Sequence, residues 1–231
     1  MNKIQIYLDS ANVDIILKSL KDKNIKGYTT NPSLMKKSNI RSYENFIKYL
    51  CKKTKKPISF EIFADKEKEI YKQAKKISSF SSNIYVKIPI VNSKGQSLHK
   101  VIKKLSEENI KLNITCVFTA EQFKRSYNVL NKKVSSIISI FCGRIADSGR
   151  NPENIIKKCL KIRKTNKVKI LWASTREFFN ITQAQNYKVD IITVPPEILE
   201  KKKYKNYNLK KFSVDTAKMF YDDAKKLNLT L

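Results

Sequence analysis

The chain has 231 residues, of which 41% are hydrophobic, enough for one sizeable core or two small ones. It contains no run of 18 or more apolar residues, so we expect no membrane span. The N-terminal MNKIQIYLDS also lacks the apolar segment of a signal peptide. Four dispersed cysteines (Cys51, Cys116, Cys142, Cys159), none in CxxC spacing, predict a reducing, cytoplasmic location and neither zinc nor disulfides. The single histidine, His99, excludes a multi-histidine metal site, and its helical context indicates a surface residue.

The formal charge of +28 is the strongest compositional signal. An excess of this size is typical of proteins that bind nucleic acid or an anionic surface. However, only six of the 48 basic residues are arginine, and the abundance of lysine, asparagine and isoleucine is typical of an AT-rich genome. The lysines are also spread over every expected helix, so we expect no dedicated nucleic-acid partner. The alternative is weak, salt-sensitive binding of nucleic acid.

Short apolar stretches alternate with longer amphipathic stretches along the whole chain. The expected strands are 4–10, 27–30, 58–63, 83–90, 112–118, 135–144, 168–174 and 190–196. The main expected helices are 13–23, 43–53, 66–77, 98–108, 120–130, 153–164, 177–187 and 213–227. Eight strand–helix units without a linker predict an α/β fold, a single (β/α)8 TIM barrel over residues 1–231. A doubly wound open sheet is the alternative, but it would not need eight equal repeats.

A lysine stands at the centre of the apolar stretch NIYVKIPI, residues 83–90. An ammonium group loses hydration in such a strand, so burial favours the neutral amine. A neutral amine is a nucleophile, and Lys87 is therefore a candidate for Schiff-base chemistry. The alternative is an edge strand from which Lys87 extends its amine to solvent.

Polar residues recur at matching positions of the expected strands. Side chains two residues apart share a face of a strand, which pairs Ser59 with Glu61 and Asn113 with Thr115. The same spacing relates Ser139 to Phe141 and places Trp172, Ser174 and Arg176 together. Asp9 lies at the end of the first strand, and Asn31 follows the second. If these faces point inward, the polar groups surround the C-terminal mouth of the barrel, where barrel active sites lie. Each residue alone has a plainer interpretation as a strand-end cap or turn residue.

Six segments resemble the transaldolase family, in the family's order and over nearly the whole chain. They are YLDSANV, GYTTNPSLM, VKIPI, LNITCVFTAEQ, ISIFCGRIAD and WASTRE. GYTTNPSLM is close to the family's TTNPS motif, the most specific of these signatures. The short length is similar to the compact, single-barrel branch of the family, and the resemblance implies a TIM barrel of the class I (Schiff-base) aldolase type.

The resemblance implies that Lys87 forms the Schiff base with a ketose phosphate and that Asp9 is the general base. Glu61 and Thr115, with a water between them, would move protons during imine formation. Asn31, Asn113 and Ser139 would hydrogen-bond the three-carbon fragment that stays attached. No metal and no organic cofactor is implied.

Arginine placement supports a phosphate site. Arg144, Arg150 and Arg176 all follow expected strands, and a planar guanidinium suits phosphate better than lysine does. Arg144 and Arg176 match the family's phosphate-binding positions, with Ser174 beside them. Arg150 matches none and is interpreted as a surface residue.

The resemblance implies a transaldolase of the pentose phosphate pathway, which transfers a dihydroxyacetone unit between sugar phosphates. The alternative within the superfamily is fructose-6-phosphate aldolase, which releases free dihydroxyacetone. Those aldolases tend to carry glutamine at the position of Glu61 and tyrosine at that of Phe141, so both residues favour transfer. The segments DSGRNP and VNSKGQS match neither the transaldolase pattern nor the aldolase pattern. They leave the acceptor sugar undetermined, and a modified sugar is one of the alternatives.

A third interpretation is a barrel without catalysis that serves as a basic nucleic-acid-binding or scaffold protein. The set Asp9, Glu61, Lys87 and Thr115 argues against it, because a binding protein has no use for a buried lysine. Resemblance to the compact branch also implies a ring-like homo-oligomer in which the C-terminal helix reaches a neighbouring subunit.

Overall fold

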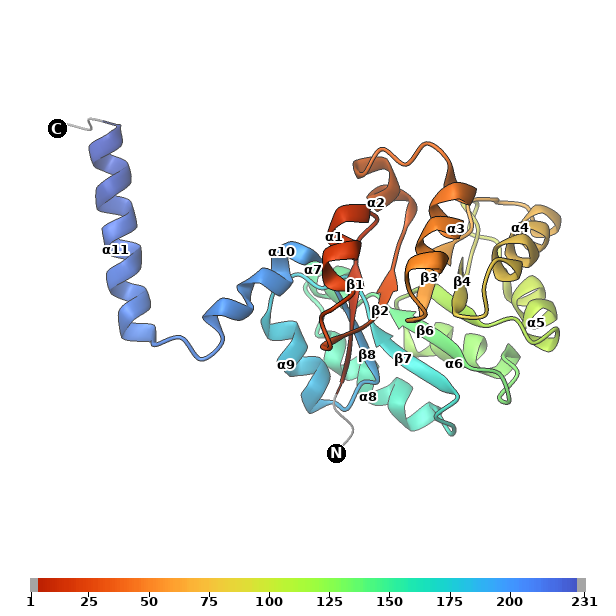
Figure 1. Cartoon of the computed structure of the whole chain (residues 1–231). Coiled ribbons are helices and arrows are strands. Elements are labelled where there is room, and N and C mark those ends of the chain that lie inside the picture. The colour runs from red at the N-terminus through yellow and green to blue at the C-terminus, as the bar shows by residue number, and fades with distance from the viewer. Residues whose placement is uncertain (1–3, 228–231) are drawn as a thin grey trace.

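Eight parallel strands form a closed barrel in the computed structural model, which describes residues 4–227 (Figure 1). Neighbouring strands in the chain pair with each other, and β8 pairs back with β1, so the open-sheet alternative is wrong. The strands are β1 (Gln5–Asp9), β2 (Ile25–Thr29), β3 (Ile58–Glu61), β4 (Ile84–Pro89), β5 (Leu112–Val117), β6 (Ser136–Ile140), β7 (Val168–Trp172) and β8 (Ile191–Val194).

Helices follow the strands and, except at the C-terminal end of the chain, they cover the outside of the barrel (Figure 1). They are α1 (Val13–Ser19), α2 (Pro32–Lys37), α3 (Tyr43–Lys53), α4 (Glu67–Ser79), α5 (His99–Glu107), α6 (Ala120–Val129), α7 (Cys142–Asp147), α8 (Pro152–Ile162), α9 (Phe179–Asn186), α10 (Pro196–Leu199), the 3-10 helix η1 (Glu200–Tyr204) and α11 (Leu209–Lys226). Polar caps start several of them; Thr119, for example, forms a capping box with Gln122 at α6.

The strands bury two separate layers of side chains. The outward layer packs under the helices and includes Val86 and Ile88 of β4. A smaller inward cluster, formed by Tyr7, Tyr85, Ile137, Leu171, Ala173 and Ile191, fills the barrel. Successive strand residues alternate between these layers, so polar residues at inward positions near the C-terminal strand ends face the barrel mouth.

Two details of the sequence interpretation are wrong. The strand expected at 135–144 ends at Ile140, and Arg144 lies on helix α7 instead. Trp172 belongs to the outward layer, because Leu171 and Ala173 take the inward positions of β7. Ser174 reaches the mouth only because the chain leaves the strand after Trp172 and turns through a left-handed conformation, with φ of 64° at Ser174.

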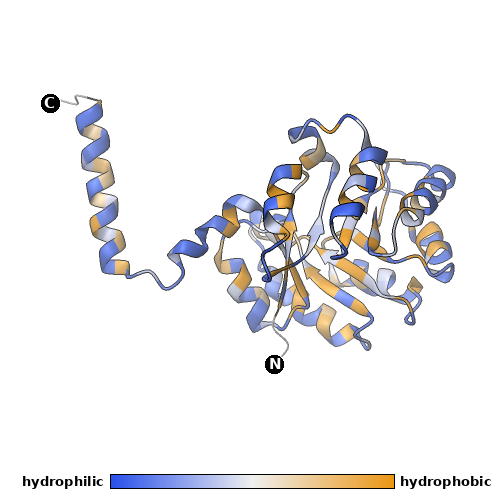
Figure 2. Cartoon of the chain, in the orientation of Figure 1, coloured by the Kyte–Doolittle hydropathy of each residue, from blue (hydrophilic) through white to orange (hydrophobic). Residues whose placement is uncertain are grey.

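The C-terminal helix stands away from the barrel (Figure 1). It was expected at 213–227 and begins four residues earlier, at Leu209, where Asn208 accepts hydrogen bonds from the first turn. None of its residues is buried, and hydrophobic and hydrophilic residues alternate along it (Figure 2). Within residues 4–227, no helix is both long and apolar enough to cross a membrane.

Candidate active site

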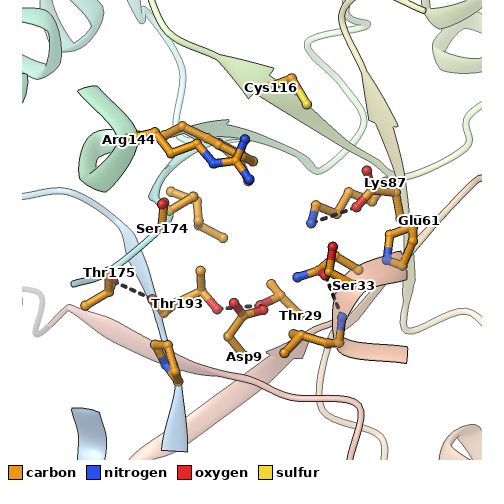
Figure 3. A pocket seen from close by; sticks show the side chains of 18 of the residues that line it. Asp9, Thr29, Ser33, Glu61, Lys87, Cys116, Arg144, Ser174, Thr175 and Thr193 are labelled. Carbon is orange, nitrogen blue, oxygen red and sulfur yellow. Dashed lines mark hydrogen bonds and ion pairs between the residues drawn. The ribbon is translucent and has the colours of Figure 1, made fainter. Parts of the chain in front are cut away.

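A cavity of about 400 Å³ opens at the C-terminal end of the barrel (Figure 3). Every strand contributes at least one lining residue: Asp9, Thr29, Glu61, Lys87, Cys116, Ser139, Leu171 and Thr193. The cavity therefore depends on closure of the whole barrel. Of the eleven side chains expected at the site from the sequence, nine line the cavity: Asp9, Asn31, Glu61, Lys87, Ser139, Phe141, Arg144, Ser174 and Arg176.

Lys87 points into the cavity from the middle of β4 (Figure 3). The residue is 7% exposed, and its Nζ lies 3.0 Å from Glu61 Oε2 and donates to the backbone oxygen of Thr30 at 3.1 Å. Glu61 is its register partner on β3. The edge-strand alternative is thus wrong, because β4 pairs with a strand on each side. The geometry gives an amine that is shielded from water and has a carboxylate within proton-transfer distance.

Asp9 ends β1 across the cavity from the Arg144 side (Figure 3). Its Oδ1 accepts a hydrogen bond of 2.7 Å from the Thr29 hydroxyl. Burial raises the pKa of Asp9, and the Lys87 ammonium and the Thr29 hydrogen bond oppose that effect. A carboxylate with a raised pKa takes up protons more readily than an exposed one, which suits a general base.

Asn113 and Thr115 lie on β5 and do not line the cavity, unlike the other nine residues. The Asn113 amide donates to Ser59 Oγ at 2.9 Å and accepts from Ser139 Oγ at 2.7 Å, so it holds Ser139 in place. The Thr115 hydroxyl is fully buried and has no hydrogen-bond partner within the described chain. A buried hydroxyl of this kind calls for a water or a substrate group.

Asn31 and Phe141 form parts of the wall. Asn31 caps α2, where its Oδ1 accepts from the backbone N–H of Leu34 at 2.9 Å, which leaves the amide N–H groups for a ligand. The Phe141 ring packs against Phe118 with ring centroids 5.4 Å apart. Its other neighbour is Arg144, whose guanidinium carbon lies 5.6 Å from the Phe141 centroid.

Arg144, Ser174 and Arg176 lie together on one side of the cavity. Gly143 makes this possible, because a Cβ there would lie 1.6 Å from the backbone oxygen of Ser174. Arg176 already has a partner, since its Nη2 donates to Asp147 Oδ2 at 2.6 Å and its Nε to the same oxygen at 3.1 Å. Two guanidinium groups and a hydroxyl are the donors that a phosphate needs.

Two residues that the sequence analysis interpreted as surface residues, Arg150 and His99, lie outside the cavity. Arg150 is exposed and does not line the cavity. His99 begins α5, outside the cavity, and its Nδ1 lies 2.7 Å from Ser97 Oγ. Burial lowers the pKa of His99, which is half-buried, so only part of its ring is at the surface. Among residues 4–227, no three histidine, cysteine, aspartate or glutamate side chains are grouped to hold a metal ion.

The sequence analysis missed several lining residues, among them Thr29, Cys116 and Thr193. Thr29 and Thr193 occupy inward positions of β2 and β8, so the same two-residue spacing would have found them. Cys116 follows the inward Thr115, so strict alternation along the strand would turn its side chain outward. Its φ of 60°, at a register irregularity between Ile114 and Val117, turns the thiol toward the cavity (Figure 3). No sequence signal marks that irregularity.

The comparison with known proteins agrees with this geometry. A family model described as Transaldolase/Fructose-6-phosphate aldolase matches residues 6–231. The chain belongs to this family. The family resemblance noted in the sequence is thereby confirmed, and so is the class I aldolase type of barrel. The protein is an enzyme of the family, and its substrates are in the family's class of sugar phosphates.

Several compact relatives carry the name "Probable transaldolase". One from Petrotoga mobilis is 32% identical over 201 residues, which covers 86% of each chain. One from Methanococcus vannielii is 30% identical over 200 residues, 86% of this chain and 89% of the relative. One from Thermoplasma volcanium is 32% identical over 201 residues, 85% and 86% of the two chains. The family match extends over α11, at the end of the chain.

Proposed function

We propose that this enzyme is a transaldolase, which moves a dihydroxyacetone unit from a ketose phosphate to an aldose phosphate through a Schiff base on Lys87. The observation that carries the proposal is the placement of Lys87, buried at the cavity floor with Glu61 3.0 Å away. Asp9 on β1 faces the same space (Figure 3). A nucleophilic amine, a proton-transfer carboxylate and a separate base are what imine-based carbon–carbon cleavage needs.

In the proposed reaction, Lys87 first gives a proton to Glu61, its ion-pair partner. The neutral amine then attacks the C2 carbonyl carbon, and loss of water gives the imine. Glu61 moves the protons of this step through a water held at the unpartnered hydroxyl of Thr115. Asp9 then takes the proton of the C4 hydroxyl as the C3–C4 bond breaks. The electron pair of that bond goes into the protonated imine, forming an enamine, and the aldose leaves. Attack of the enamine on a new aldehyde, with return of the proton from Asp9, reverses these steps.

The residues in the wall of the cavity suggest how the substrate would bind. Arg144, Ser174 and Arg176 would take the phosphate, at the opposite end of the substrate from the carbon held by Lys87. Ser139, positioned by Asn113, and the free amide of Asn31 would hold hydroxyls of the attached fragment.

Two side chains support transfer of the dihydroxyacetone unit rather than its release. Release of dihydroxyacetone needs a proton donor at the enamine carbon, and the phenyl ring of Phe141 has none. Glu61 is ion-paired with Lys87 and so is held at the imine. The fructose-6-phosphate aldolase reaction is the alternative, and the matched family contains both activities.

The decisive experiment uses borohydride, which reduces an imine to a stable amine. With fructose 6-phosphate, we expect a three-carbon adduct on Lys87, located by intact mass and peptide mapping, and none in Lys87→Ala. Lys169→Ala is the matched control, because Lys169 is also a strand lysine but contacts Gln5 near the other end of the barrel. An adduct on a different lysine would contradict the proposal.

The same protein distinguishes transfer from release. With fructose 6-phosphate alone we expect one turnover and then a near stall, and erythrose 4-phosphate should restart the enzyme and give sedoheptulose 7-phosphate. Phe141→Tyr should shift the ratio toward free dihydroxyacetone, because a phenol can donate a proton or order a water. Rapid dihydroxyacetone release by the unmodified enzyme would make it an aldolase.

The basic-scaffold alternative predicts no reaction with any sugar phosphate. It has little support, because a binding surface has no need of the Lys87–Glu61 ion pair inside the barrel. We also propose a homo-oligomer, supported by apolar residues that α11 exposes on one side, Leu209 and Phe220 among them.

A further inference from the structure

Among residues 4–227, Asp9 has a single side-chain hydrogen bond, from the Thr29 hydroxyl to Oδ1 at 2.7 Å. A threonine hydroxyl has one proton and two lone pairs. When Thr29 donates to an ionised Asp9, its only proton is used. Any further hydroxyl in contact with Thr29 must then be the donor.

Thr193 is that further hydroxyl. Its Oγ1 hydrogen-bonds the Oγ1 of Thr29, from a position 164 residues further along the chain (Figure 3). Both threonines are almost fully buried, at 2% and 5% exposure, so bulk water does not compete for these hydroxyls. The proton count therefore makes Thr193 the donor and gives the chain a single direction, from Thr193 to Thr29 to Asp9.

Thr193 itself is fixed on two sides. Its backbone lies beside Tyr7 in the pairing of β8 with β1, two residues before Asp9. Its carbonyl accepts a hydrogen bond of 2.6 Å from the Thr175 hydroxyl, in the segment that carries Ser174 and Arg176 (Figure 3). The hydroxyl of Thr193 is thus aimed by the strand that closes the barrel.

We propose that Thr193 is a positioning residue for the base Asp9: by donating to Thr29 it commits the Thr29 proton to Oδ1 of Asp9. The other carboxylate oxygen is then left to take the substrate's hydroxyl proton. This inference rests on the proposed function, in which Asp9 is the base. Neither threonine is one of the sequence candidates, and Thr193 acts only through Thr29.

Several charged groups face Asp9. The hydrogen-bonded hydroxyls of Thr193 and Thr29 add their effect on Asp9 to the effect of these charges. Lys87 on β4 stabilises the ionised carboxylate, whereas Glu61 on β3 and Glu197 on α10 oppose ionisation. Arg144 and Arg176 line the same cavity from its phosphate side. Because these charges are unchanged in a threonine variant, a change in the acid limb of the pH profile reports the loss of the hydroxyl chain.

The test uses Thr29→Val, Thr193→Val and the double variant, with Thr193→Ser as the rescue. We expect Thr193→Val to lower kcat about 3- to 10-fold and Thr29→Val about 10- to 100-fold, since the latter loses a bond to a charged group. The double variant should match Thr29→Val within about 2-fold, because Thr193 has no other route to Asp9. Thr193→Ser should restore most of the activity.

The pH dependence of kcat/KM gives a readout that packing alone would not change. Removal of a donor to the carboxylate raises the pKa of Asp9, so its acid limb should move to higher pH in Thr29→Val and, less strongly, in Thr193→Val. Thr193→Ser should keep the parent profile. Thr54→Val, which removes a buried hydroxyl outside the cavity, should leave both rate and profile unchanged.

Failure of this inference is distinguishable from failure of the proposed function. Imine formation with dihydroxyacetone needs no carbon–carbon cleavage, so borohydride should trap it on Lys87 equally in the parent and in all threonine variants. If the parent does not form the adduct, the proposed function fails and the inference with it. The role of Thr193 is refuted if the adduct forms but the rate losses of Thr29→Val and Thr193→Val multiply in the double variant. It is also refuted if Thr193→Val keeps the rate and the pH profile of the parent. Thr193→Ala repeats the test should the Val variant not fold.

Discussion

The proposed catalytic role of the Asp9 carboxyl group conflicts with the stability of the fold. Burial raises its pKa, which means that the folded protein holds a proton there more tightly than the unfolded chain does. A group of this kind stabilises the fold fully below its unfolded pKa, and that contribution is lost as pH rises through the folded pKa. At neutral pH and above, the ionised Asp9 therefore costs stability, a cost that its proposed role as general base would explain.

Asp9→Asn should accordingly melt at a higher temperature than the parent at pH 8, because it removes a buried charge. The gain should shrink as pH falls and vanish where Asp9 is protonated in both states. Carbon–carbon cleavage should fall about 10²- to 10⁴-fold, the usual contribution of a general base. Thermal melts over a pH series and turnover of fructose 6-phosphate measure the two effects. Asp14→Asn on the exposed side of α1 is the control, and an equal gain there would refute the explanation.

At the scale of elements, the short helix α7 and the end of β7 build the anion side together. They approach closely enough that only glycine fits at position 143, where a Cβ would meet the backbone oxygen of Ser174 at 1.6 Å. A backbone atom cannot move aside as a flexible side chain can. The approach brings Arg144 of α7 next to Ser174, whose own φ is 64°. The geometry of the site thus comes from two elements rather than from any single strand.

Gly143→Ala is expected to push α7 away from β7. The overpacking should cost about 1–3 kcal/mol in the free energy of unfolding, measured in urea. It should also raise KM for fructose 6-phosphate more than KM for unphosphorylated fructose, because it separates the proposed phosphate ligands and leaves Lys87 in place. Ala146→Ser, at an exposed position of the same helix, is the control. Equal changes in both KM values would place the phosphate elsewhere.

At the scale of the molecule, the barrel is complete without its last helix. The structure places α11 apart from the barrel with no buried residue (Figure 1). At about 100° per residue, Leu209, Phe220 and Leu227 fall on one stripe of the helix, and they are 78%, 63% and 69% exposed. An apolar stripe of this kind is usually covered by a partner. A second copy of the chain fits the homo-oligomer implied by the family resemblance.

Phe220→Lys should therefore lower the molar mass in sedimentation equilibrium to that of a monomer, by placing a charge in the stripe. Val214→Lys is the matched control, because Val214 is exposed on another side of α11, among lysines. Far-UV circular dichroism of both variants should show an intact barrel. A parent that sediments as a monomer would remove the oligomer proposal without affecting the chemistry of Lys87.

Much of the fold and of the site was determined by the sequence alone. Strand–helix alternation depends on local periodicity, and eight units leave few architectures other than a closed barrel. Lys87 became a candidate because a charged residue in an apolar strand is rarely buried without a partner. Glu61 and Asp9 became candidates through the two-residue spacing of strands and the position at a strand end. The family resemblance added their roles and the order of the motifs.

Only the tertiary structure decided the contacts that depend on barrel closure and on local breaks in periodicity. The pairing of β8 with β1 sets Thr193 against Thr29 across 164 residues, and no local pattern specifies that register. The irregularity in β5 that turns Cys116 inward and the close approach at Gly143 likewise need neighbouring strands to define them. Periodicity tells which face a side chain takes, whereas the packing of the whole barrel decides which side chains meet.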